Sequence, residues 1–473
     1  MLQLASGVAL LAACSGDVVN IGDGEPPPEP LPSYSRCLDS TTLEGTVVVS
    51  DQAGLDALDG CETIQGDVFV QPYFYPDLTA LHALREVTGE LSFSVAPPQD
   101  GEGETSAESR LSGEIYGKWL PTFAGLERLE RAGSLFIGLA AATDLEPLSG
   151  LRELTGEGRL YLERTAVRDL APLAQLRGIR SLFVDGDQLE SIADLALPPR
   201  MTGLGLGGPQ LVKVGGVDQV RSVSGAFYVS NTALRDLSAL SALEEVGSLG
   251  IGGNALLETL DGLEQLKIVG DLASITDNPA LRDLDALSGL QVAGALQVYG
   301  NASLKRVPDF PELLTREIGI SNNPELEEIV NFTGEQRRWG VLIDGTYRQM
   351  EDVSELSDLQ FRYEFIGVFN NPKLRAYTLP KDLRGAKSVI IANNASLADL
   401  DLGSVEAVDM LSIKANPALA HVALGALATV DLLGVQGNPL LPLETFDPVR
   451  TFERRMSSDP IPPPDCSGGE CAP

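Results

Sequence analysis

The chain has 473 residues, with 67 acidic and 34 basic side chains and a net charge of -33. This charge repels phosphate backbones and anionic membrane surfaces, so we expect no nucleic-acid partner. Its two histidines, His82 and His421, are far apart in the sequence and leave little material for acid/base or zinc chemistry. We therefore expect no metal site, no cofactor and no enzymatic activity.

An apolar run opens the chain and ends in the letters LAAC at Cys14. It is too short to span a bilayer but has the length of a signal-peptide core. The run resembles the signal of bacterial lipoproteins, which implies removal of residues 1–13 and acyl chains on Cys14 as a membrane anchor. The alternative is an N-terminus that is apolar by chance. The Pro-rich residues 14–36 follow, and we expect them to form an extended tether.

The remaining four cysteines fall into two pairs. Cys37 and Cys61 are 24 residues apart, which equals one repeat period of the chain described below. Stacked coils would bring them to the Cα separation of about 5 Å that a disulfide needs, so residues 37–62 are predicted to be a disulfide-capped N-terminal coil. Cys466 and Cys471 would close a small loop in the tail, within a C-terminal cap and tail at residues 444–473. A metal pair is the weaker alternative for the tail cysteines, since no second pair lies nearby.

Residues 63–443 repeat with a period of 22 to 24 residues. A typical repeat has an alternating segment such as Leu296-Gln297-Val298, which is typical of a half-buried strand, then a turn, then a leucine-rich return such as Leu260 to Leu266. A period of this length indicates a solenoid, in which each coil buries its apolar face against its neighbours. We predict a right-handed, leucine-rich-repeat-like β-solenoid with one long parallel sheet and about 17 coils.

Each predicted coil has a middle strand residue that points outward. In chain order these residues are Val48, Phe69, Ser92, Phe136, Tyr161, Phe183, Gly205, Tyr228, Gly250, Ser274, Gln297, Gly319, Leu342, Gly367, Ile390, Ser412 and Gly434. The step from Ser92 to Phe136 is long because it contains an acidic segment without periodicity, residues 96–114, which we interpret as a loop inserted into one coil.

An asparagine recurs in the turns of the second half, followed by leucine or a similar residue three positions later. We expect its amide to bond to backbone groups of its own and the adjacent coil. The predicted ladder consists of Asn231, Asn254, Asn278, Asn301, Asn323, Asn371, Asn394, Asn416 and Asn438. Earlier coils have one residue less in the turn and carry Arg164, Gly186 or Gly208 at this position, so two kinds of repeat are predicted to join near Asn231.

The pattern L-x-G-L-x-x-L, then V-x-G-x-L-x-I, then N-x-x-L-x-x-L resembles the receptor L-domain family. The residues from Leu260 to Val307 carry it best, and the resemblance extends from Val47 to Leu441. These are solenoids of growth-factor receptor ectodomains, with relatives among fungal cell-wall proteins and bacterial lipoproteins. The resemblance implies an extracellular recognition scaffold without catalysis.

Five of the outward middle residues are aromatic: Phe69, Phe136, Tyr161, Phe183 and Tyr228. We expect the last four to form one stripe, interrupted at Gly205 and extended by Phe69. Aromatic rows on a surface are typical of binding faces, so the stripe is the candidate ligand-binding face for a protein or a polysaccharide. The alternative is that the rings only stabilise the sheet through cross-strand contacts. Beyond Tyr228 the same positions are mostly Gly, Ser or Gln, and we expect a flatter, less adhesive surface there.

Glu163 and Asp185 are the best catalytic candidates, because they face outward on successive coils. Paired carboxylates about 5 Å apart serve glycoside hydrolysis or hold calcium. We expect neither pKa to be shifted by burial, and we interpret the pair as a solvated rim. The sequence therefore favours a non-enzymatic, lipid-anchored scaffold of the cell envelope, at the outer membrane or cell surface. A passive envelope component and a carbohydrate-active enzyme are the alternatives.

Overall fold

A computed structural model of the chain describes residues 37, 40–71, 74–93, 120–138, 140–192, 195–311, 313, 315, 317–330, 340–343, 346–349, 363–379 and 385–457. The predicted lipidation residue Cys14, the tail cysteines Cys466 and Cys471, and the acidic insertion 96–114 lie outside the described residues.

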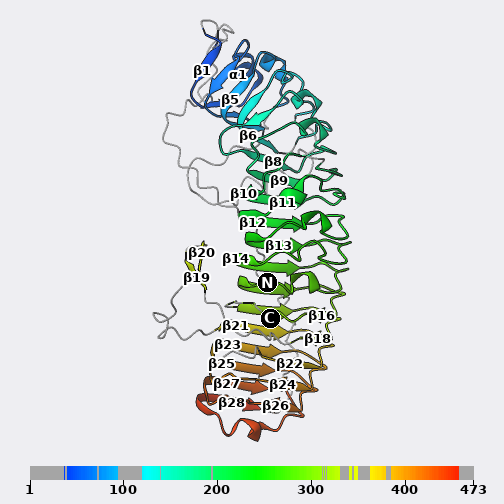
Figure 1. Ribbon diagram of the computed structural model, residues 1–473, viewed down its shortest axis with the longest axis vertical. Coiled ribbons are helices and arrows are strands. Elements are labelled where there is room, and N and C mark those ends of the chain that lie inside the picture. The colour runs from blue at the N-terminus through cyan, green and yellow to red at the C-terminus, as the bar shows by residue number, and fades with distance from the viewer. Residues whose placement is uncertain are drawn as a thin grey trace, which may run out of the picture.

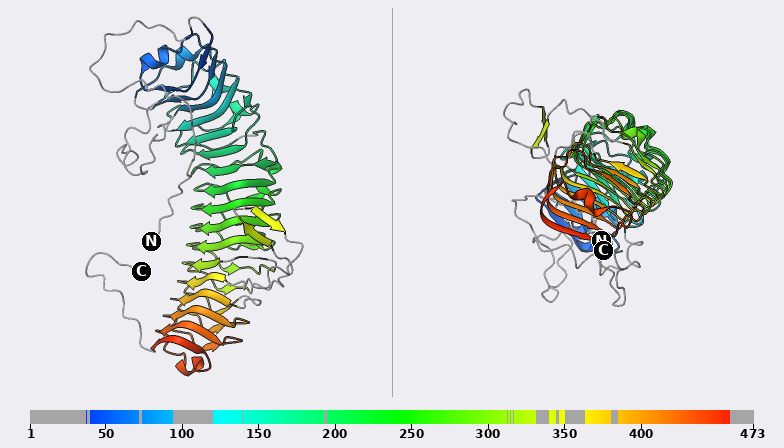
Figure 2. Two further views of the ribbon diagram at one scale, coloured as in Figure 1. Left: turned by 90° about the vertical axis from the view of Figure 1, so that its left-hand side faces the viewer. Right: turned by 90° about the horizontal axis from the view of Figure 1, so that it is seen from below.

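One parallel sheet of 21 strands runs through the described part of the chain and bends into a gently curved stack (Figures 1 and 2). Its strands are β1 (Thr42–Glu44), β2 (Val47–Val49), β3 (Thr63–Gln65), β4 (Val68–Val70), β5 (Glu86–Phe93), β6 (Arg131–Gly138), β7 (Glu153–Leu154), β8 (Arg159–Glu163), β9 (Ser181–Asp185), β10 (Arg200–Met201), β11 (Gly203–Gly207), β12 (Ser222–Ser230), β13 (Glu245–Gly252), β14 (Ile268–Thr276), β15 (Val292–Tyr299), β17 (Glu317–Ser321), β21 (Tyr363–Phe369), β23 (Gly385–Ala392), β25 (Ala407–Lys414), β27 (Thr429–Gln436) and β28 (Arg450–Ser457).

The register of the sheet confirms the predicted parallel solenoid. The predicted middle residues, Leu342 excepted, pair in an unbroken column from Val48 to Gly434, and Arg455 of β28 continues it. The fold is thus a leucine-rich-repeat-like parallel β-solenoid of about 16 turns with one long sheet.

The predicted coil around Leu342 is wrong. Leu342 pairs with Tyr347 in an antiparallel hairpin of β19 (Gly340–Ile343) and β20 (Thr346–Gln349), while Gly319 of β17 pairs directly with Gly367 of β21. Figure 1 shows this hairpin apart from the stack. The spacing of the apolar residues around Leu342 imitates a repeat, but the segment lacks the turn asparagine that the flanking coils carry.

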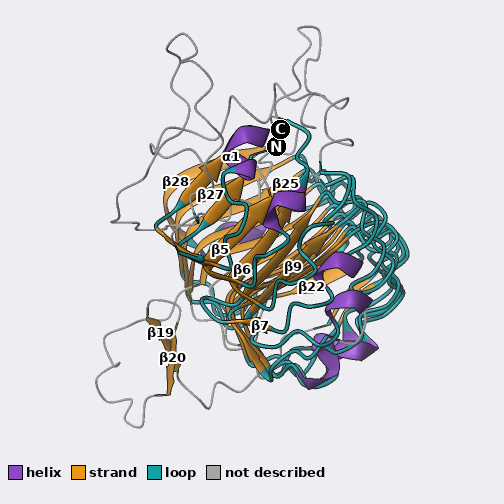
Figure 3. Ribbon diagram, turned by 90° about the horizontal axis from the view of Figure 1, so that it is seen from above, coloured by secondary structure: helices purple, strands orange, loops and turns teal. Residues whose placement is uncertain are grey.

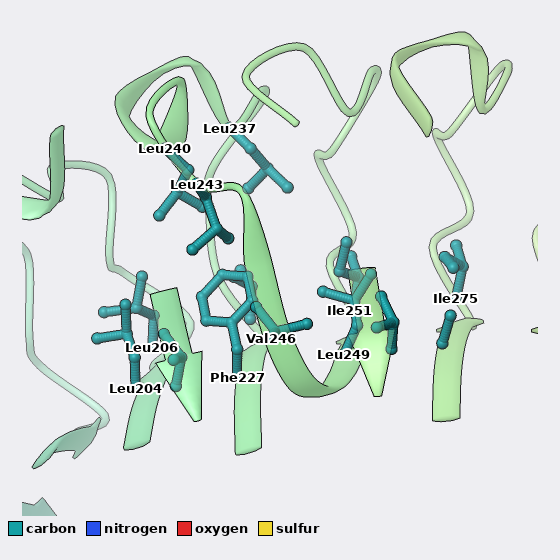
Figure 4. Close-up of a cluster of buried hydrophobic side chains, with 14 of the residues drawn as sticks. Leu204, Leu206, Phe227, Leu237, Leu240, Leu243, Val246, Leu249, Ile251 and Ile275 are labelled. Carbon is teal, nitrogen blue, oxygen red and sulfur yellow. The ribbon is translucent and has the colours of Figure 1, made fainter. Parts of the chain in front are cut away.

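Inside each coil, the inward strand residues meet the leucines of the return segment. Figure 4 shows Leu204, Phe227 and Ile251 of successive strands facing Leu237 and Leu240 of one return. All five side chains are almost fully buried. Since each coil contributes the same few apolar positions, the core is a continuous column that lengthens with every repeat.

Short helices form most of the described return segments near the N-terminus and in the middle of the chain. They lie on a different side of the coil from the sheet (Figure 3). They are α1 (Gln52–Asp56) and the 3₁₀ helices η1 (Leu78–Leu81), η2 (Glu146–Leu148), η3 (Ala171–Leu173), η4 (Val217–Gln219), η5 (Ser238–Leu240), η6 (Asp285–Leu287) and η8 (Leu443–Phe446). In several of them an aspartate one residue before the N-cap accepts a hydrogen bond from the first helical N–H. In η5, for example, the Ser238 N–H donates to Asp236 Oδ1 at 3.0 Å.

Later coils replace some of these helices with two small parallel sheets. One joins β16 (Arg306–Val307) to β18 (Glu328–Ile329). The other joins β22 (Ala376–Thr378), β24 (Asp399–Asp401) and β26 (His421–Ala423). In these two sheets the backbone N–H and C=O groups of a return segment bond to the neighbouring coil. In the helical returns the corresponding groups bond within a single helical turn.

The last strand, β28, closes the described stack with charged side chains. Arg454 pairs in register with the inward Leu433, and its guanidinium donates to the carbonyl oxygens of Phe446 and Val449 and to Asp447. An inward charge of this kind protects a sheet edge from pairing with another chain. The sequence places this strand in the C-terminal cap but gives no alternating apolar pattern for it.

Candidate binding face

Four aromatic side chains, which we call the aromatic stripe, line the outward face of neighbouring strands. They are Phe136 of β6, Tyr161 of β8, Phe183 of β9 and Tyr228 of β12, and each is half-buried. The ring centroids of Phe136 and Tyr161 are 5.5 Å apart and those of Tyr161 and Phe183 are 4.7 Å apart, both pairs being stacked. The rings thus cover one another's faces and turn mainly their edges toward solvent.

The aromatic stripe continues across β11, where Gly205 occupies the outward middle position. The centroids of Phe183 and Tyr228 are 5.5 Å apart with an angle of 33° between the ring planes. A Cβ atom on Gly205 would lie 2.2 Å from Tyr228 Cζ and 2.5 Å from Phe183 Cδ1, so both rings lie over the bare glycine. The predicted interruption at Gly205 is therefore wrong, because the missing side chain provides the space in which the rings meet.

Phe69 lies on the same face but is separated from the aromatic stripe by one strand. Ser92 of β5 pairs in register with Phe69 on one side and with Phe136 on the other. The Ser92 side chain is only 2% exposed. Phe69 therefore shares the column of outward residues, with the small serine between it and the stacked rings.

Both phenols of the aromatic stripe stay protonated at neutral pH. Burial raises the pKa of Tyr228, and the negative charges of Asp185 and Glu163 act in the same direction. Burial also raises the pKa of Tyr161. The aromatic stripe therefore offers two neutral hydroxyl groups, each able to donate and accept a hydrogen bond.

The carboxylates Glu163 and Asp185 pair in register on β8 and β9, at the exposed end of each strand. Burial raises the pKa of Asp185, the charge of Asp187 adds to the rise, and Arg164 opposes it. The expectation that burial shifts neither carboxylate is therefore wrong for Asp185. Partial desolvation of one carboxylate was not predictable from the strand pattern, since it depends on how closely neighbouring coils pack.

A shallow hollow of about 530 Å³ lies where the strands β9, β10 and β12 begin, and sequence reasoning missed it. Arg180 and Arg200 line it together with the hydroxyl-bearing Thr202, Ser222 and Ser224. Within the described part of the chain neither guanidinium has a carboxylate partner. The signal available in the sequence was an arginine directly before the strand of one coil and another at the first strand position of the next coil, in a chain that is acidic overall.

A second apolar group lies on the C-terminal half of the face. Phe365 and Phe369 flank Gly367 on β21, where an added Cβ would come within 2.5 Å of the Phe365 ring and 3.0 Å of the Phe369 ring. Further half-buried apolar side chains follow on the next strands: Ile390, Met410 and Leu432. The expectation of a flat, less adhesive surface there is correct only for most of the middle positions, because these side chains stand mainly at the flanking positions of the strand.

The asparagine ladder is a buried chain of amide hydrogen bonds. In a typical step, the Asn278 N–H donates to Asn301 Oδ1 at 3.1 Å, and Asn278 Nδ2 donates to the Ile251 carbonyl at 3.0 Å. Its members are Asn254, Asn278, Asn301, Asn323, Asn371, Asn394, Asn416 and Asn438, all at most 1% exposed. Asn323 bonds directly to Asn371, so the ladder passes over the segment that carries the hairpin.

Asn231 is not a member of this ladder, which corrects the prediction. Thr232 takes the first position, donating to Asn254 Oδ1 from its backbone N–H at 2.9 Å and from its hydroxyl at 2.8 Å. Asn231 is exposed and has a φ of 55°, the left-handed conformation that Gly253 has in the next coil. Arg164 and Gly208 also occupy this left-handed position rather than the ladder position. The shorter turn of these coils made the two positions hard to separate by counting.

The disulfide between Cys37 and Cys61 is present, as predicted, with the Cα atoms 5.2 Å apart. Within the described residues no group of three or more His, Cys, Asp or Glu side chains is placed to hold a metal ion. The same part of the chain contains no helix that is long and apolar enough to cross a membrane.

A scan of the chain against protein-family models finds no match, and neither does a search of curated proteins. Among solved structures, the functional domain of InlJ from Listeria monocytogenes, which includes a cysteine ladder, is similar at 14% identity. The match covers 78% of this chain and 74% of that one, with a TM-score of 0.26. The assignment as a leucine-rich-repeat-like solenoid rests on the strand pairing and the asparagine ladder of the chain itself.

Proposed function

We propose that the protein is a non-enzymatic recognition scaffold that binds a protein or polysaccharide partner at the cell surface. The observation that carries this proposal is the aromatic stripe, four half-buried rings that run from Phe136 to Tyr228 on the outward face of the sheet. Rigid aromatic side chains with a hydroxyl group supply large contact areas at low entropic cost, which is why they are enriched in binding faces. We further propose that the repeats are of the receptor L-domain type, on the sequence pattern described above.

A passive envelope component is the competing function. In that case the rings serve only as cross-strand contacts, each contributing roughly 0.2 to 1 kcal/mol to the sheet. The face-to-face stacking of Phe136, Tyr161 and Phe183 suits this role as well. The two functions differ in whether the same rings also bind a ligand, so binding measurements separate them.

The test is a screen against glycans and surface proteins with the wild type and the double variant Tyr161→Ser, Phe183→Ser. Ile390→Ser is the matched control, because Ile390 occupies the same outward column in the C-terminal half. Loss of binding in the double variant alone, with unchanged circular dichroism, supports the proposal. Equal binding by the double variant and the wild type, or no binding by any of the three, overturns it.

We also propose that Cys14 carries the lipid that anchors the protein in the cell envelope, at the outer membrane or cell surface. The support is the LAAC sequence at the end of an apolar run and the Pro-rich tether after it. The Cys14→Ser variant is expected to leave the membrane fraction and appear in the soluble fraction. Unchanged partitioning of Cys14→Ser between the two fractions would refute the anchor.

A carbohydrate-active enzyme is the second candidate, favoured by the raised pKa of Asp185 beside Glu163. A carboxyl with a raised pKa is suited to act as a general acid, and a neighbouring carboxylate would serve as base or nucleophile. Release of reducing ends from a polysaccharide by the wild type, abolished in Asp185→Asn, would establish this activity in place of simple binding.

A further inference from the structure

Tyr228 is the last ring of the aromatic stripe, and it leans away from the strand that follows. Its Cζ and hydroxyl oxygen lie above Gly205, at 2.2 and 2.5 Å from the place of an added Cβ. One face of the ring meets Phe183, whereas the next strand, β13, offers Gly250 in the adjacent outward position. The other face of Tyr228 is therefore not covered by a residue of the outward column.

The surface beyond Tyr228 is flat and bears free hydroxyl groups. At Gly250 an added Cβ would meet only the Cβ of Tyr228, at 3.5 Å. On β13 and β14 the outward neighbours are Ser248, Gly252, Ser274 and Thr276, each half-buried. Within the described residues the hydroxyls of these two serines and of Thr276 have no hydrogen-bond partner. We call Ser248, Gly250, Gly252, Ser274 and Thr276 the glycine shelf.

Gly250 is not needed for the fold. Its φ lies outside the left-handed region, and there is room for a Cβ atom. Glycine weakens a strand relative to other residues and often marks a place where a ligand approaches the backbone closely. Gly250 leaves the strand without a side chain next to the uncovered face of Tyr228. We therefore interpret it as a place where a ligand approaches the backbone closely.

The glycine shelf has the size and polarity of a sugar site. Three strand spacings separate Tyr228 from Gln297, which gives about 14 Å of open sheet along the stack. The outward positions from Ser248 to Gly252 and from Leu272 to Thr276 carry no charge, although the chain has a net charge of -33. An uncharged floor with hydroxyl groups offers an ionic ligand no compensation for its lost hydration.

We propose that the glycine shelf binds a neutral sugar residue of a polysaccharide, with the apolar face of the sugar ring against Tyr228 and its hydroxyl groups bonded to Ser274 and Thr276. This inference rests on the proposed function and assigns its partner to the polysaccharide class. Phe183 contacts the face of Tyr228 that is turned away from the glycine shelf. This contact restricts movement of the Tyr228 ring in that direction.

The test uses variants that fill the shelf without removing a contact. Gly250→Val places a branched side chain beside Tyr228 at a position where β-branched residues favour the strand. Gly319→Val is the matched control, because Gly319 lies in the same column and its added Cβ would meet only Gln297 Cγ, at 3.8 Å. Urea unfolding of both variants verifies that the solenoid remains folded.

Binding is measured by titration calorimetry of the full chain with four neutral hexasaccharides, of the cello, malto, manno and chito series, and with hexagalacturonate as the anionic probe. We expect the wild type to bind at least one neutral probe, Gly250→Val to lose at least tenfold in affinity, and Gly319→Val to change by less than twofold. Equal binding by Gly250→Val and the wild type overturns the proposal that the glycine shelf binds a sugar. So does binding of the wild type to the anionic probe alone, or to no probe.

The two proposals fail in distinguishable ways. If the double variant Tyr161→Ser, Phe183→Ser loses a partner that Gly250→Val retains, the aromatic stripe is a binding face and the shelf assignment is wrong. If neither variant changes any interaction found in the screen, both are wrong.

Discussion

Phe183 and Tyr228 contact each other over Gly205, although the strands that carry them, β9 and β12, are separated by β11. Neighbouring strands are about 4.8 Å apart, so rings two spacings away meet only if the strand between them has no side chain in the way. Gly203 supports the same arrangement, since a Cβ there would lie 2.5 Å from Phe183 Cζ. Gly203 and Gly205 thus leave the space through which Tyr228 contacts the other rings of the aromatic stripe.

Gly205→Ala is expected to separate the two rings. The added methyl group would lie 2.2 Å from Tyr228 Cζ, so the phenol must move, and the contact worth about 0.5 to 1.5 kcal/mol is lost. Near-ultraviolet circular dichroism should report the movement of the tyrosine, and urea unfolding should show the destabilisation. Gly250→Ala is the control and should unfold at the same or a higher urea concentration. Identical spectra for Gly205→Ala and the wild type would contradict the described stacking.

Asn301→Ala is expected to destabilise the solenoid by about 3 kcal/mol or more. It removes the acceptor of the buried Asn278 N–H and the amide donor to the Ile275 carbonyl, and each buried group that loses its partner costs about 1 to 3 kcal/mol. Urea unfolding measures the loss.

Asn231→Gly is the matched control for this ladder variant, because Asn231 has a left-handed φ and lies outside the ladder. Glycine adopts this conformation without a steric cost, so stability should change little. Comparable destabilisation by Asn231→Gly and Asn301→Ala would show that Asn231 belongs to the ladder after all.

Much of the fold was predictable because one coil constrains the next. The alternation of Leu296 and Val298 around Gln297 fixes which side of the strand is buried, and stacking repeats this choice in every coil. Leu342 shows the limit of the argument, since apolar spacing alone does not distinguish a coil from a hairpin. The direct bond from Asn323 to Asn371 is visible in the sequence only as a doubled interval between asparagines.

The candidate site was predictable only in part. Strand alternation placed Tyr161 and Phe183 outward, but the lean of Tyr228 over Gly205 depends on the space that a glycine on another strand leaves. The shifted pKa of Asp185 and the hollow between Arg180 and Arg200 also depend on contacts between coils. Periodicity gives the direction of a side chain, whereas these properties need its position relative to its neighbours.

Removal of the disulfide should destabilise the N-terminal coil and leave the distant coils unchanged. The cross-link closes a loop of 24 residues, for which about 2 to 4 kcal/mol is typical. In a solenoid each coil contacts only its neighbours, so the loss should stay local. Hydrogen exchange of Cys37→Ser, Cys61→Ser should show faster exchange in β2 and β4 and unchanged exchange in β25 and β27. Uniform acceleration along the whole chain would contradict this local stabilisation.

Two aspartates should affect the pH dependence of stability with opposite signs. The pKa of Asp185 is raised in the folded chain, first by burial and then by Asp187, so the folded state holds this proton more tightly than the unfolded state. The contribution of Asp185 to the free energy of unfolding is therefore favourable at low pH. It is lost as the pH rises from the ordinary carboxyl range through the raised pKa. Asp185→Asn should be more stable than the wild type at pH 7 and equally stable at pH 3.

Asp236 should behave in the opposite way. The Ser238 hydroxyl and backbone N–H donate to its carboxylate and lower its pKa, so its contribution is present above the ordinary carboxyl pKa and is lost as the pH falls through the lowered value. Asp236→Asn keeps an oxygen acceptor but loses the charge, and should therefore be less stable than the wild type at pH 7, with a difference that shrinks toward pH 2. Urea unfolding of both variants across this range checks the signs. A stabilising effect of Asp236→Asn at pH 7 would contradict the charged cap.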